Sequence, residues 1–309
     1  MSVASTTDLL VVGGGPAGVS AALTAASLGM RTTLVEADRI GSKLYAIGAL
    51  DNLAGGWTNG PQLAKALATD VERLAAAGTC TAIHGRAVSV GADEEGAHVV
   101  LEDGRDLRAT AVVVATGVSA LGLHDVEWVE ASGLSSPQPL WRTMPEALQE
   151  CGHIVVVGAD RPLGTWLRAH SEADVSLHVL HPESDRYKTD ELAGDPRVHL
   201  ERTKHALIVP IPGGVRVTTQ RPEGGVHTFA ADVLLMNAGS KPAALTGLAT
   251  DADGYCPVDA QDRRVLIAGD LKSSRMQRIA IAMGDGQRCA LIPYYERVLL
   301  PTGAAADSL

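Results

Sequence analysis

The chain has 309 residues, of which 46% are hydrophobic and 20% charged, and its formal net charge is -10 at pH 7. This composition describes a folded globular chain with one large or two modest cores, and it excludes a fibrous or disordered protein. The acidic balance, with no basic run longer than Arg263 and Arg264, argues against nucleic acid and against an anionic membrane surface as partners.

Neither end of the chain suggests targeting to a membrane. Met1 to Asp8 lacks the basic and apolar pattern of a signal peptide, and no apolar run approaches the roughly 20 residues that span a bilayer. We therefore expect a cytoplasmic protein. The small, polar tail from Pro301 to Leu309 is expected to be frayed.

The cysteines give no sign of redox or metal chemistry. Their wide spacing excludes a local CxxC pair and the closely spaced ligand pairs of zinc sites, so we predict buried free thiols and no metal site. The four are Cys80, Cys151, Cys256 and Cys289.

The first 36 residues have the pattern of a dinucleotide-binding βαβ unit. An apolar run, Asp8 to Val12, leads into Gly-Gly-Gly-Pro-Ala-Gly at 13–18 and then into an Ala-rich helical segment that ends near Gly29. A β-branched run from Arg31 to Val35 follows and ends at Glu36. Strand, glycine turn, helix, strand and acid occur here in the order and spacing of that unit.

Each motif residue has a physical reason. Gly13 permits the tight turn, Gly15 lets the backbone approach a pyrophosphate, and Gly18 allows the helix to pack closely on the strand. The helix N-terminus supplies N–H groups and a positive dipole. Glu36 is then expected to accept hydrogen bonds from the ribose hydroxyls.

Two later apolar runs favour FAD over NAD at this site. The sequence AVVVATG at 111–117 predicts a buried strand that ends in a Thr-Gly turn, and VLIAGD at 265–270 predicts another that ends in an acid. The second of these runs lies near the C-terminus, so the chain would return late to the first nucleotide site. Such a return suits a long dinucleotide that needs contacts from distant segments. Taken alone, both runs could be ordinary core strands.

The order of these motifs resembles the low-molecular-weight thioredoxin reductase family over nearly the whole chain. GGGPAG, VEA, a Gly-x-x-Leu segment, DNL-x-G, ATG, and AGD before a Gly-x-Gly helix all occur in that order. The resemblance implies an α/β fold with two Rossmann-like, three-layer nucleotide-binding domains, the second inserted in the first. Residues 1–120 and 241–309 are expected to bind FAD, and residues 121–240 to form a degenerate NAD(P)-binding-like domain. Homodimers are usual in the family.

The resemblance also implies the FAD contacts. Asp270 would hold the ribitol, Asn52 would lie near the flavin, and residues 277–279 would border its ring. The full set is Gly13, Gly15, Pro16, Ala17, Gly18, Glu36, Ala37, Lys43, Leu44, Asn52, Ala115, Thr116, Gly117, Gly269, Asp270, Gln277, Arg278 and Ile279.

One substitution beside the flavin is chemically suggestive. The family's Gly-Gly-Gln-Leu is here Gly41-Ser42-Lys43-Leu44, so a lysine replaces the glutamine that approaches the ring. As a hypothesis, Lys43 stabilises a reduced anionic flavin; the alternative is a solvated surface lysine. Lys43, Tyr45 and Arg278 are the catalytic candidates, with Trp57 as a further group near the ring, but they form no recognisable acid/base pair and no catalytic base is assigned.

The family's dithiol is missing. Where its CxxC lies, at the start of the second domain, the chain reads Gly-Leu-Ser-Ser-Pro-Gln-Pro at 133–139. Serine cannot replace a thiolate because its pKa is far higher. The sequence therefore excludes dithiol exchange through that motif.

The second nucleotide motif is altered as well. After the strand predicted at His153–Val157, Asp160 stands where a glycine should admit the pyrophosphate, which adds bulk and a negative charge. The next strand ends in His181-Pro182-Glu183 instead of the basic sequence that binds a 2′-phosphate. We interpret this domain as a scaffold, although weak nicotinamide binding in a changed pose stays open. Val215–Thr219 and Ala231–Asn237 are predicted to form its antiparallel element.

These features predict an FAD-dependent dehydrogenase or oxidase. The substrate would be small or tethered to a carrier protein, in natural-product biosynthesis, and dioxygen or another acceptor would reoxidise the flavin. Two alternatives stay open: a flavin reductase linked to NAD(P)H or ferredoxin, and a non-catalytic FAD-binding scaffold.

Overall fold

The computed structural model describes residues 7–192 and 194–299, and the chain divides into two compact units. The expectations for Pro301–Leu309 and for most of Met1–Asp8 lie outside the described residues. The first unit comprises the described residues of Met1–Leu44, Leu50–Val118 and Pro242–Leu309, and the second those of Tyr45–Ala49 and Ser119–Lys241.

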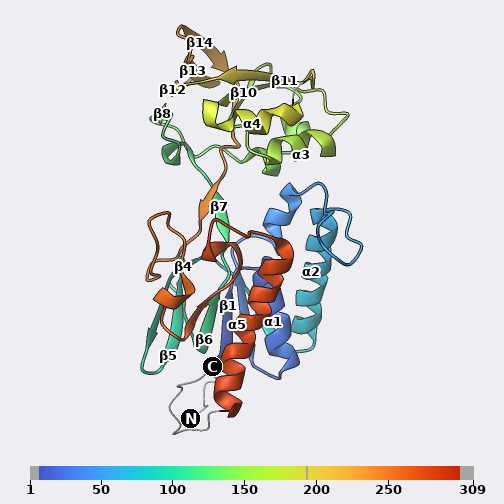
Figure 1. Cartoon of the computed structure of the whole chain (residues 1–309), viewed down its shortest axis with the longest axis vertical. Coiled ribbons are helices and arrows are strands. Elements are labelled where there is room, and N and C mark those ends of the chain that lie inside the picture. Colours follow the sequence, from blue (N-terminus) through green and yellow to red (C-terminus); the bar gives the residue numbers. More distant parts are fainter. Residues whose placement is uncertain (1–6, 193, 300–309) are drawn as a thin grey trace. The chain divides into compact units, whose positions relative to one another are not determined.

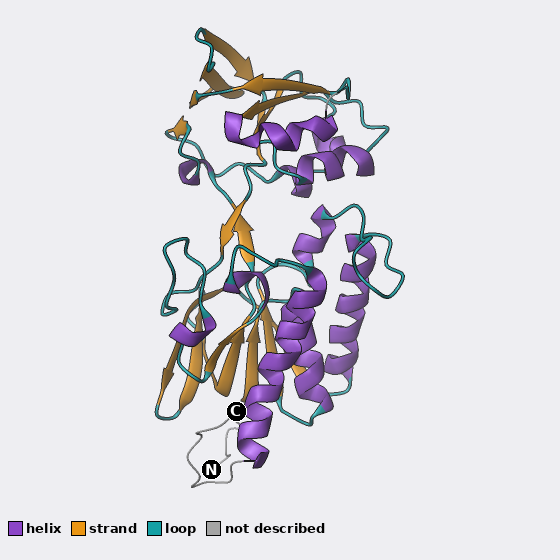
Figure 2. Cartoon of the chain, viewed as in Figure 1, coloured by secondary structure: helices purple, strands orange, loops and turns teal. Residues whose placement is uncertain are grey.

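Both units are α/β, as predicted (Figures 1 and 2). The second is inserted between the parts of the first, except that Tyr45–Ala49 groups with it. The binding roles and exact bounds assigned to the two domains stay predictions.

The first unit is built on one seven-stranded sheet. Its strands are β1 (Thr7–Val12), β2 (Thr32–Glu36), β3 (Cys80–His84), β4 (Ala87–Asp93), β5 (Gly96–Leu101), β6 (Asp106–Val114) and β17 (Val265–Ile267). Their order is β3-β2-β1-β6-β5-β4, and β17 also pairs with β6. Strand β6 serves both partners because β5 runs antiparallel to its first half and β17 runs parallel to its second half. The carboxyl ends of the five parallel strands β1, β2, β3, β6 and β17 therefore meet at one edge.

Three helices cover one face of this sheet (Figure 1). They are α1 (Pro16–Ser27), α2 (Gly60–Ala76) and α5 (Ile279–Leu299). The other face is buried too: Leu10, Val12 and Val112 pack into one core with Val99 and Leu245. Burial on both faces explains why the parallel strands are continuous apolar runs. Among the described residues, no helix combines the length and apolar character needed to cross a membrane.

Helices α1 and α5 pack closely because the contact residue in α5 is a glycine. A Cβ built on Gly286 of α5 would overlap the carbonyl oxygen of Ala17 in α1. Gly269, just after β17, would place a Cβ 3.0 Å from the Ala17 Cβ. The C-terminal return of the chain can therefore reach the start of α1 only because both positions are glycine.

The second unit has two sheets. Its strands are β8 (Val129–Ala131), β9 (Ile154–Val157), β10 (Leu177–His181), β11 (Val198–Arg202), β12 (His205–Ile211), β13 (Gly214–Gln220), β14 (Val226–Ala231) and β15 (Val233–Met236). The parallel sheet has the order β11-β10-β9-β15, and the other has the order β14-β13-β12-β8. The helices α3 (Pro162–Ala169) and α4 (Arg186–Thr189) complete the unit. The short strands β7 (Val118–Ala120) and β16 (Ser240–Pro242) pair with each other.

The parallel sheet of this unit lies between two cores. One core joins it to Leu163 and Trp166 of α3, and the other joins Val155 and Val157 of β9 to Ile208 of the second sheet. Helix, parallel sheet and second sheet make the three layers that were predicted.

The predicted antiparallel pair Val215–Thr219 with Ala231–Asn237 is wrong. Strand β13 instead pairs with β12 and β14, and Val233–Met236 forms β15, parallel to β9. The carboxylate of Asp232 accepts hydrogen bonds from the N–H groups of Gly152 and His153 at 2.7 and 2.9 Å, and so directs the chain from one sheet to the other. The unbroken apolar run after it suits a strand of a parallel sheet, and β15 is the last strand in the order of this sheet.

The Gly286 contact predicts a clear stability difference. Gly286→Ala should lower the free energy of unfolding by about 1–3 kcal/mol because its Cβ has no space. Gly284→Ala, two residues away in the same helix with nothing within 4 Å of its Cβ, should be neutral or stabilising by up to about 1 kcal/mol. Urea unfolding of the two variants checks this; equal effects would show that the contact of α1 with α5 adjusts freely.

Candidate functional site

The glycine turn after β1 is closed to side chains at two positions and open at a third. Gly13 has φ +106°, and a Cβ there would overlap the carbonyl oxygen of Ala115 at the end of β6. A Cβ on Gly18 would overlap the carbonyl oxygen of Gly13. By contrast, a Cβ on Gly15 would have nothing within 4 Å, and no side chain caps the N-terminus of α1. The backbone there is accessible to an anion, as a pyrophosphate cradle requires.

Glu36, at the end of β2, holds this turn. Its Oε2 accepts a hydrogen bond from Gly14 N at 2.5 Å, and its Oε1 accepts one from Asp38 N at 2.7 Å. Each carboxylate oxygen has a second lone pair, so Glu36 can still accept ribose hydroxyls. The sequence predicted the ribose role but not this support of the glycine turn.

The segment after β2 is attached to the same turn. Gly41 has φ +68°, and its N–H donates to Gly14 O at 2.9 Å. The short 3-10 helix Ser42–Ala46 follows, with Leu44 buried. Gly41 was not among the predicted site residues, because its positive φ and its hydrogen bond to Gly14 are visible only in the structure.

The ATG turn at the end of β6 is fixed on two sides. Ala115 N donates to Val12 O at 2.8 Å. The Thr116 hydroxyl donates to Ala243 O at 2.7 Å, and Ala243 N donates to Gly117 O at 3.0 Å. From β1 the chain continues to β2 on one side, whereas β6 pairs with β1 on the other side. The ends of β1 and β6 therefore mark the topological switch point, which is where open α/β sheets bind ligands.

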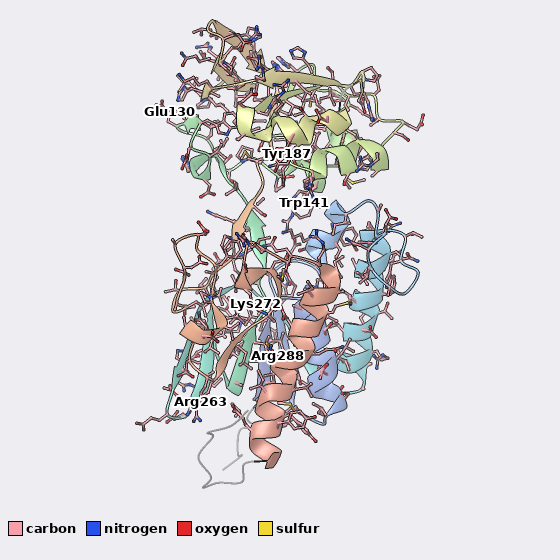
Figure 3. All side chains as sticks on the ribbon, in the orientation of Figure 1. Glu130, Trp141, Tyr187, Arg263, Lys272 and Arg288 are labelled. Carbon is pink, nitrogen blue, oxygen red and sulfur yellow. The ribbon has the colours of Figure 1, made fainter. Side chains whose placement is uncertain are left out.

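Asp270 lies at the same edge, in the 3-10 helix Gly269–Lys272 after β17. Burial raises the pKa of its carboxyl group, Lys43 lowers it, and Asp285 raises it further. Asp285 is itself engaged, since it accepts hydrogen bonds from Gly269 N at 3.3 Å and Lys272 Nζ at 2.8 Å. Lys272 is labelled in Figure 3. No residue in the described part of the chain donates a hydrogen bond to the Asp270 carboxylate, which leaves it able to accept one from a ligand hydroxyl.

The remaining predicted residues are less closely gathered. Gln277 Nε2 donates to Ser273 O at 3.0 Å, and Arg278, which is exposed, donates to Gln277 O at 2.8 Å. Asn52 is exposed in a turn. Tyr45 belongs to the second unit. The catalytic candidates therefore form no acid/base constellation within the first unit, and their roles stay predictions.

The thiols are not arranged for redox chemistry. All four cysteines are free, as predicted, but Cys151 is only half-buried, so the prediction of a buried thiol is wrong there. Burial raises the pKa of the Cys80, Cys256 and Cys289 thiols, that of Cys289 to about 11. Cys289 Sγ donates to Ile267 O at 3.5 Å. The reactive thiolate is therefore disfavoured at neutral pH.

The second unit repeats the glycine turn in an altered form. Gly158 has φ +92°, and a Cβ there would overlap the backbone of Ala238. Asp160 N donates to Asn237 O at 3.0 Å, and Asn237 Nδ2 donates to Asp160 O at 2.7 Å. The carboxylate of Asp160 lies 3.2 Å from Lys188 Nζ. The negative side chain is thus held in place at the turn.

Acidic residues also follow the next strand. Lys188 Nζ is shared with Asp185 at 3.0 Å; burial lowers the pKa of Lys188, but these two ion pairs outweigh it and raise the pKa overall. Glu183, just beyond β10, is paired with Arg202 at 3.2 Å and Arg186 at 3.5 Å. Lys188, Arg186 and Arg202 are therefore already engaged by carboxylates.

The comparisons agree with this geometry. Residues 7–159 match the model of a family described as pyridine nucleotide-disulphide oxidoreductase. The chain is 36% identical to a subunit of Staphylococcus aureus alkyl hydroperoxide reductase, over 92% of this chain and 58% of that protein. It is 25% identical to ferredoxin–NADP reductase 1 of Cupriavidus pinatubonensis, over 91% of this chain and 81% of that protein. The chain thus spans little more than half the length of the first of these relatives.

Two solved structures share the fold. Lactococcus lactis thioredoxin reductase superposes with a TM-score of 0.74 at 18% identity, covering 96% of this chain and 100% of that one. The thioredoxin reductase of T. acidophilum gives 0.67 at 20% identity, covering 94% and 98%. The predicted likeness in fold to thioredoxin reductases is confirmed.

The open space at Gly15 predicts a graded loss of the cofactor. Gly15→Ala and Gly15→Val should fold normally but lower the affinity for FAD, the valine variant at least tenfold, because each added carbon occupies the cradle. Gly122→Ala, whose Cβ would meet its neighbours no closer than 3.5 Å, is the control and should keep full flavin. Flavin absorbance per chain measures the effect; full occupancy in Gly15→Val would place the pyrophosphate elsewhere.

The raised pKa of Asp270 predicts that its negative charge destabilises the folded apoprotein, by an amount that depends on pH. Because the pKa is higher in the folded state than in the unfolded state, folding favours the protonated carboxyl, and stability is lost as pH rises through the folded pKa. Asp270→Asn should therefore stabilise the apoprotein at pH 7, and the gain should vanish in acid. Urea unfolding of the apoproteins at both pH values checks this. An equal gain at both would exclude the charge as its cause.

Proposed function

We propose that the chain, residues 7–159 of which match the pyridine nucleotide-disulphide oxidoreductase family, is an FAD-dependent dehydrogenase or oxidase that is reduced by its organic substrate. The carrying observation is Asp160, anchored at the turn where the second cradle should receive a nicotinamide dinucleotide. Two electron routes of the resembled family, a dithiol and NAD(P)H, are then missing together.

The charges at the second cradle count against NAD(P)H. A carboxylate about 4 Å from a phosphate oxygen costs about 4 kcal/mol at a protein surface. Lys188 offsets part of this, but it is shared between Asp160 and Asp185, so the group as a whole keeps a negative charge. Glu183 adds a further carboxylate at the end of β10, where NADPH-binding relatives carry cations.

The first cradle holds FAD in this proposal. The N–H groups of α1 and the open space at Gly15 receive the pyrophosphate, Glu36 the ribose hydroxyls and Asp270 the ribitol. Bound FAD would supply an acceptor for one hydride, which is a proton with two electrons, from a substrate C–H bond, with dioxygen or another oxidant as final acceptor. Lys43 contributes positive charge on the side of Asp270. The substrate is a small molecule or a carrier-protein-tethered group in natural-product biosynthesis, and the protein acts as a homodimer.

A second candidate is a ferredoxin-linked reductase. The similarity to ferredoxin–NADP reductase 1, which extends over 91% of this chain, favours it. It differs from the first proposal in requiring that a reduced protein donor or NADPH bleach the flavin.

An anaerobic titration separates these functions. The purified holoprotein is titrated with NADPH and with NADH while the flavin absorbance band is followed. We expect no bleaching at micromolar nucleotide, and rapid reoxidation in air after photoreduction. Bleaching by either nucleotide would contradict the proposal and favour a nicotinamide-dependent reductase.

The charge of Asp160 can be tested by itself. Asp160→Asn should tighten the weak binding of NADP⁺ by about tenfold, equivalent to about 1.4 kcal/mol, because one carboxylate is removed from the cradle. Asp190→Asn makes the same charge change at an exposed position and should have no effect. Calorimetric titration of both variants provides the measurement; identical affinities would show that Asp160 does not exclude the nucleotide.

A further inference from the structure

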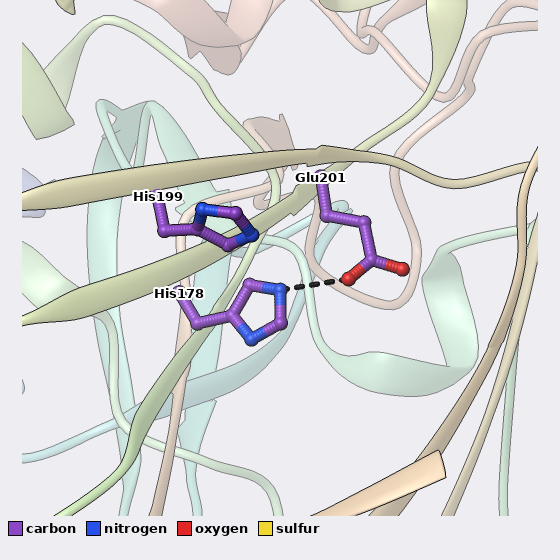
Figure 4. Close-up of side chains that lie close together, drawn as sticks. All are labelled: His178, His199 and Glu201. Atoms are coloured by element: carbon purple, nitrogen blue, oxygen red, sulfur yellow. Dashed lines mark hydrogen bonds and ion pairs between the residues drawn. The ribbon is translucent and has the colours of Figure 1, made fainter. Parts of the chain in front are cut away.

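Four histidines gather around one buried glutamate in the second unit. We call His153, His178, His199, His227 and Glu201 the histidine cluster; Figure 4 shows three of its members. His178 comes from β10, His199 and Glu201 from β11, and His227 from β14. The cluster therefore joins the parallel sheet to the antiparallel one.

Polar atoms of His178, His199 and Glu201 are close enough to share one ion. His178 Nε2 lies 2.9 Å from Glu201 Oε2, and His227 Nδ1 lies 3.3 Å from the same oxygen. A ring nitrogen of His199, a nitrogen of His178 and an oxygen of Glu201 all lie within 4.8 Å of one another. Neighbouring ligand atoms of a tetrahedral zinc ion are about 3.3 Å apart, given metal–ligand distances of about 2.0–2.1 Å.

When protons are assigned along the hydrogen bonds of the histidine cluster, the contact between His178 Nε2 and Glu201 is left without a donor. Ala230 O can only accept, so His153 Nδ1, 2.7 Å away, must carry a proton. A neutral His153 then presents its bare Nε2 to His178 Nδ1 at 3.2 Å, so His178 Nδ1 must be the donor. The Nε2 of a neutral His178 is consequently bare, and its lone pair faces the lone pairs of Glu201 at 2.9 Å. That contact is repulsive unless a cation, either a proton or a metal ion, lies between the two atoms.

The surroundings of Glu201 suit a metal ion. Its side chain is only 3% exposed, and Arg221 lies 3.6 Å from Oε1. The other oxygen, Oε2, faces His178 and His227. A metal ion there would add positive charge at the oxygen that faces the imidazoles.

We propose that the histidine cluster binds a divalent, zinc-class cation. The ligands are His178 Nε2, Glu201 Oε2 and a ring nitrogen of His199, and His227, whose Nδ1 lies 3.3 Å from Glu201 Oε2, would join them on binding. This donor set of imidazole and carboxylate suits zinc. His153 lies outside the ligand set: it accepts the Nδ1–H of His178 and passes the interaction on to Ala230 O. This is how the free nitrogen of a metal-bound histidine is usually held.

The position of the histidine cluster lets an ion enter from solvent and determines which strands the bound ion would connect. His199 is exposed, and the side chain of His227 is 45% exposed, so the ion can enter from solvent. Once bound, it would tie β10 and β11 to β14 and stabilise the second unit. The site is distinct from both glycine turns and does not depend on the proposed flavin chemistry.

Calorimetric titration with zinc chloride tests the proposal. The probe is added to tag-free holoprotein that has been treated with a chelator and dialysed. We expect one zinc ion per chain with a dissociation constant of micromolar or below, and a rise in melting temperature on binding. His199→Ala and His227→Ala, which remove exposed ligands without opening the core, should each weaken binding at least tenfold. His153→Ala should weaken it by about 10- to 100-fold through loss of the outer hydrogen bond.

His205→Ala is the matched control. It removes a half-exposed histidine from the same unit, on β12, outside the cluster, and zinc should bind it as it binds the wild type. Unchanged flavin content and unchanged melting temperature without zinc show that each variant is folded. The proposal is overturned if the wild type binds no zinc, or if His199→Ala and His227→Ala bind it as tightly as the wild type does.

Discussion

At Gly18, helix α1 approaches the glycine turn so closely that a single added carbon would overlap the carbonyl oxygen of Gly13. The same restriction recurs between Gly13 and Ala115, and between Gly286 and Ala17. Backbone therefore touches backbone at three points around one helix N-terminus. Because of these contacts, the ends of β1, β6 and β17 lie beside the amides of α1, and Asp270 comes to the same edge as Glu36. The cofactor site of the first unit depends on this closeness more than on any side-chain interaction.

The two units show what happens when such a turn is kept and when it is changed. In the first, Gly15 leaves open space in front of the helix. In the second, the sharp turn survives at Gly158, but Asp160 follows it and is fixed by Asn237 and Lys188. The fold of the second unit is preserved because its cores do not involve these residues. The changed turn therefore costs the fold little, which is compatible with the scaffold role that we predict for this unit.

The sequence predicted the parts of the structure that depend on short-range pattern. The βαβ unit was readable because strand, glycine turn, helix and acid follow one another within 36 residues. The hydrogen bonds from Gly14 N to Glu36 and from Gly269 N to Asp285 could not be predicted in this way. Each joins two segments, and the number of residues between the segments does not reveal that they lie close together in the fold.

The error at Val233–Met236 has a similar origin. Neighbouring strands in sequence usually pair, and only the hydrogen bonds of Asp232 to Gly152 and His153 send this one to another sheet. The histidine cluster was missed because its members come from separate strands, whereas the prediction of no metal site considered spacing among cysteines. Side-chain sites assembled across a sheet leave no periodic signal in one sequence.

In our proposal, the chain retains one dinucleotide site and has lost the other. Equilibrium dialysis of the FAD-loaded protein against NADP⁺, combined with extraction and counting of bound flavin, tests both halves at once. We predict one FAD per chain and no NADP⁺ retained at micromolar concentration. Stoichiometric retention of NADP⁺ beside FAD would show that Asp160 and its neighbours do not block the second cradle, and would contradict the proposal.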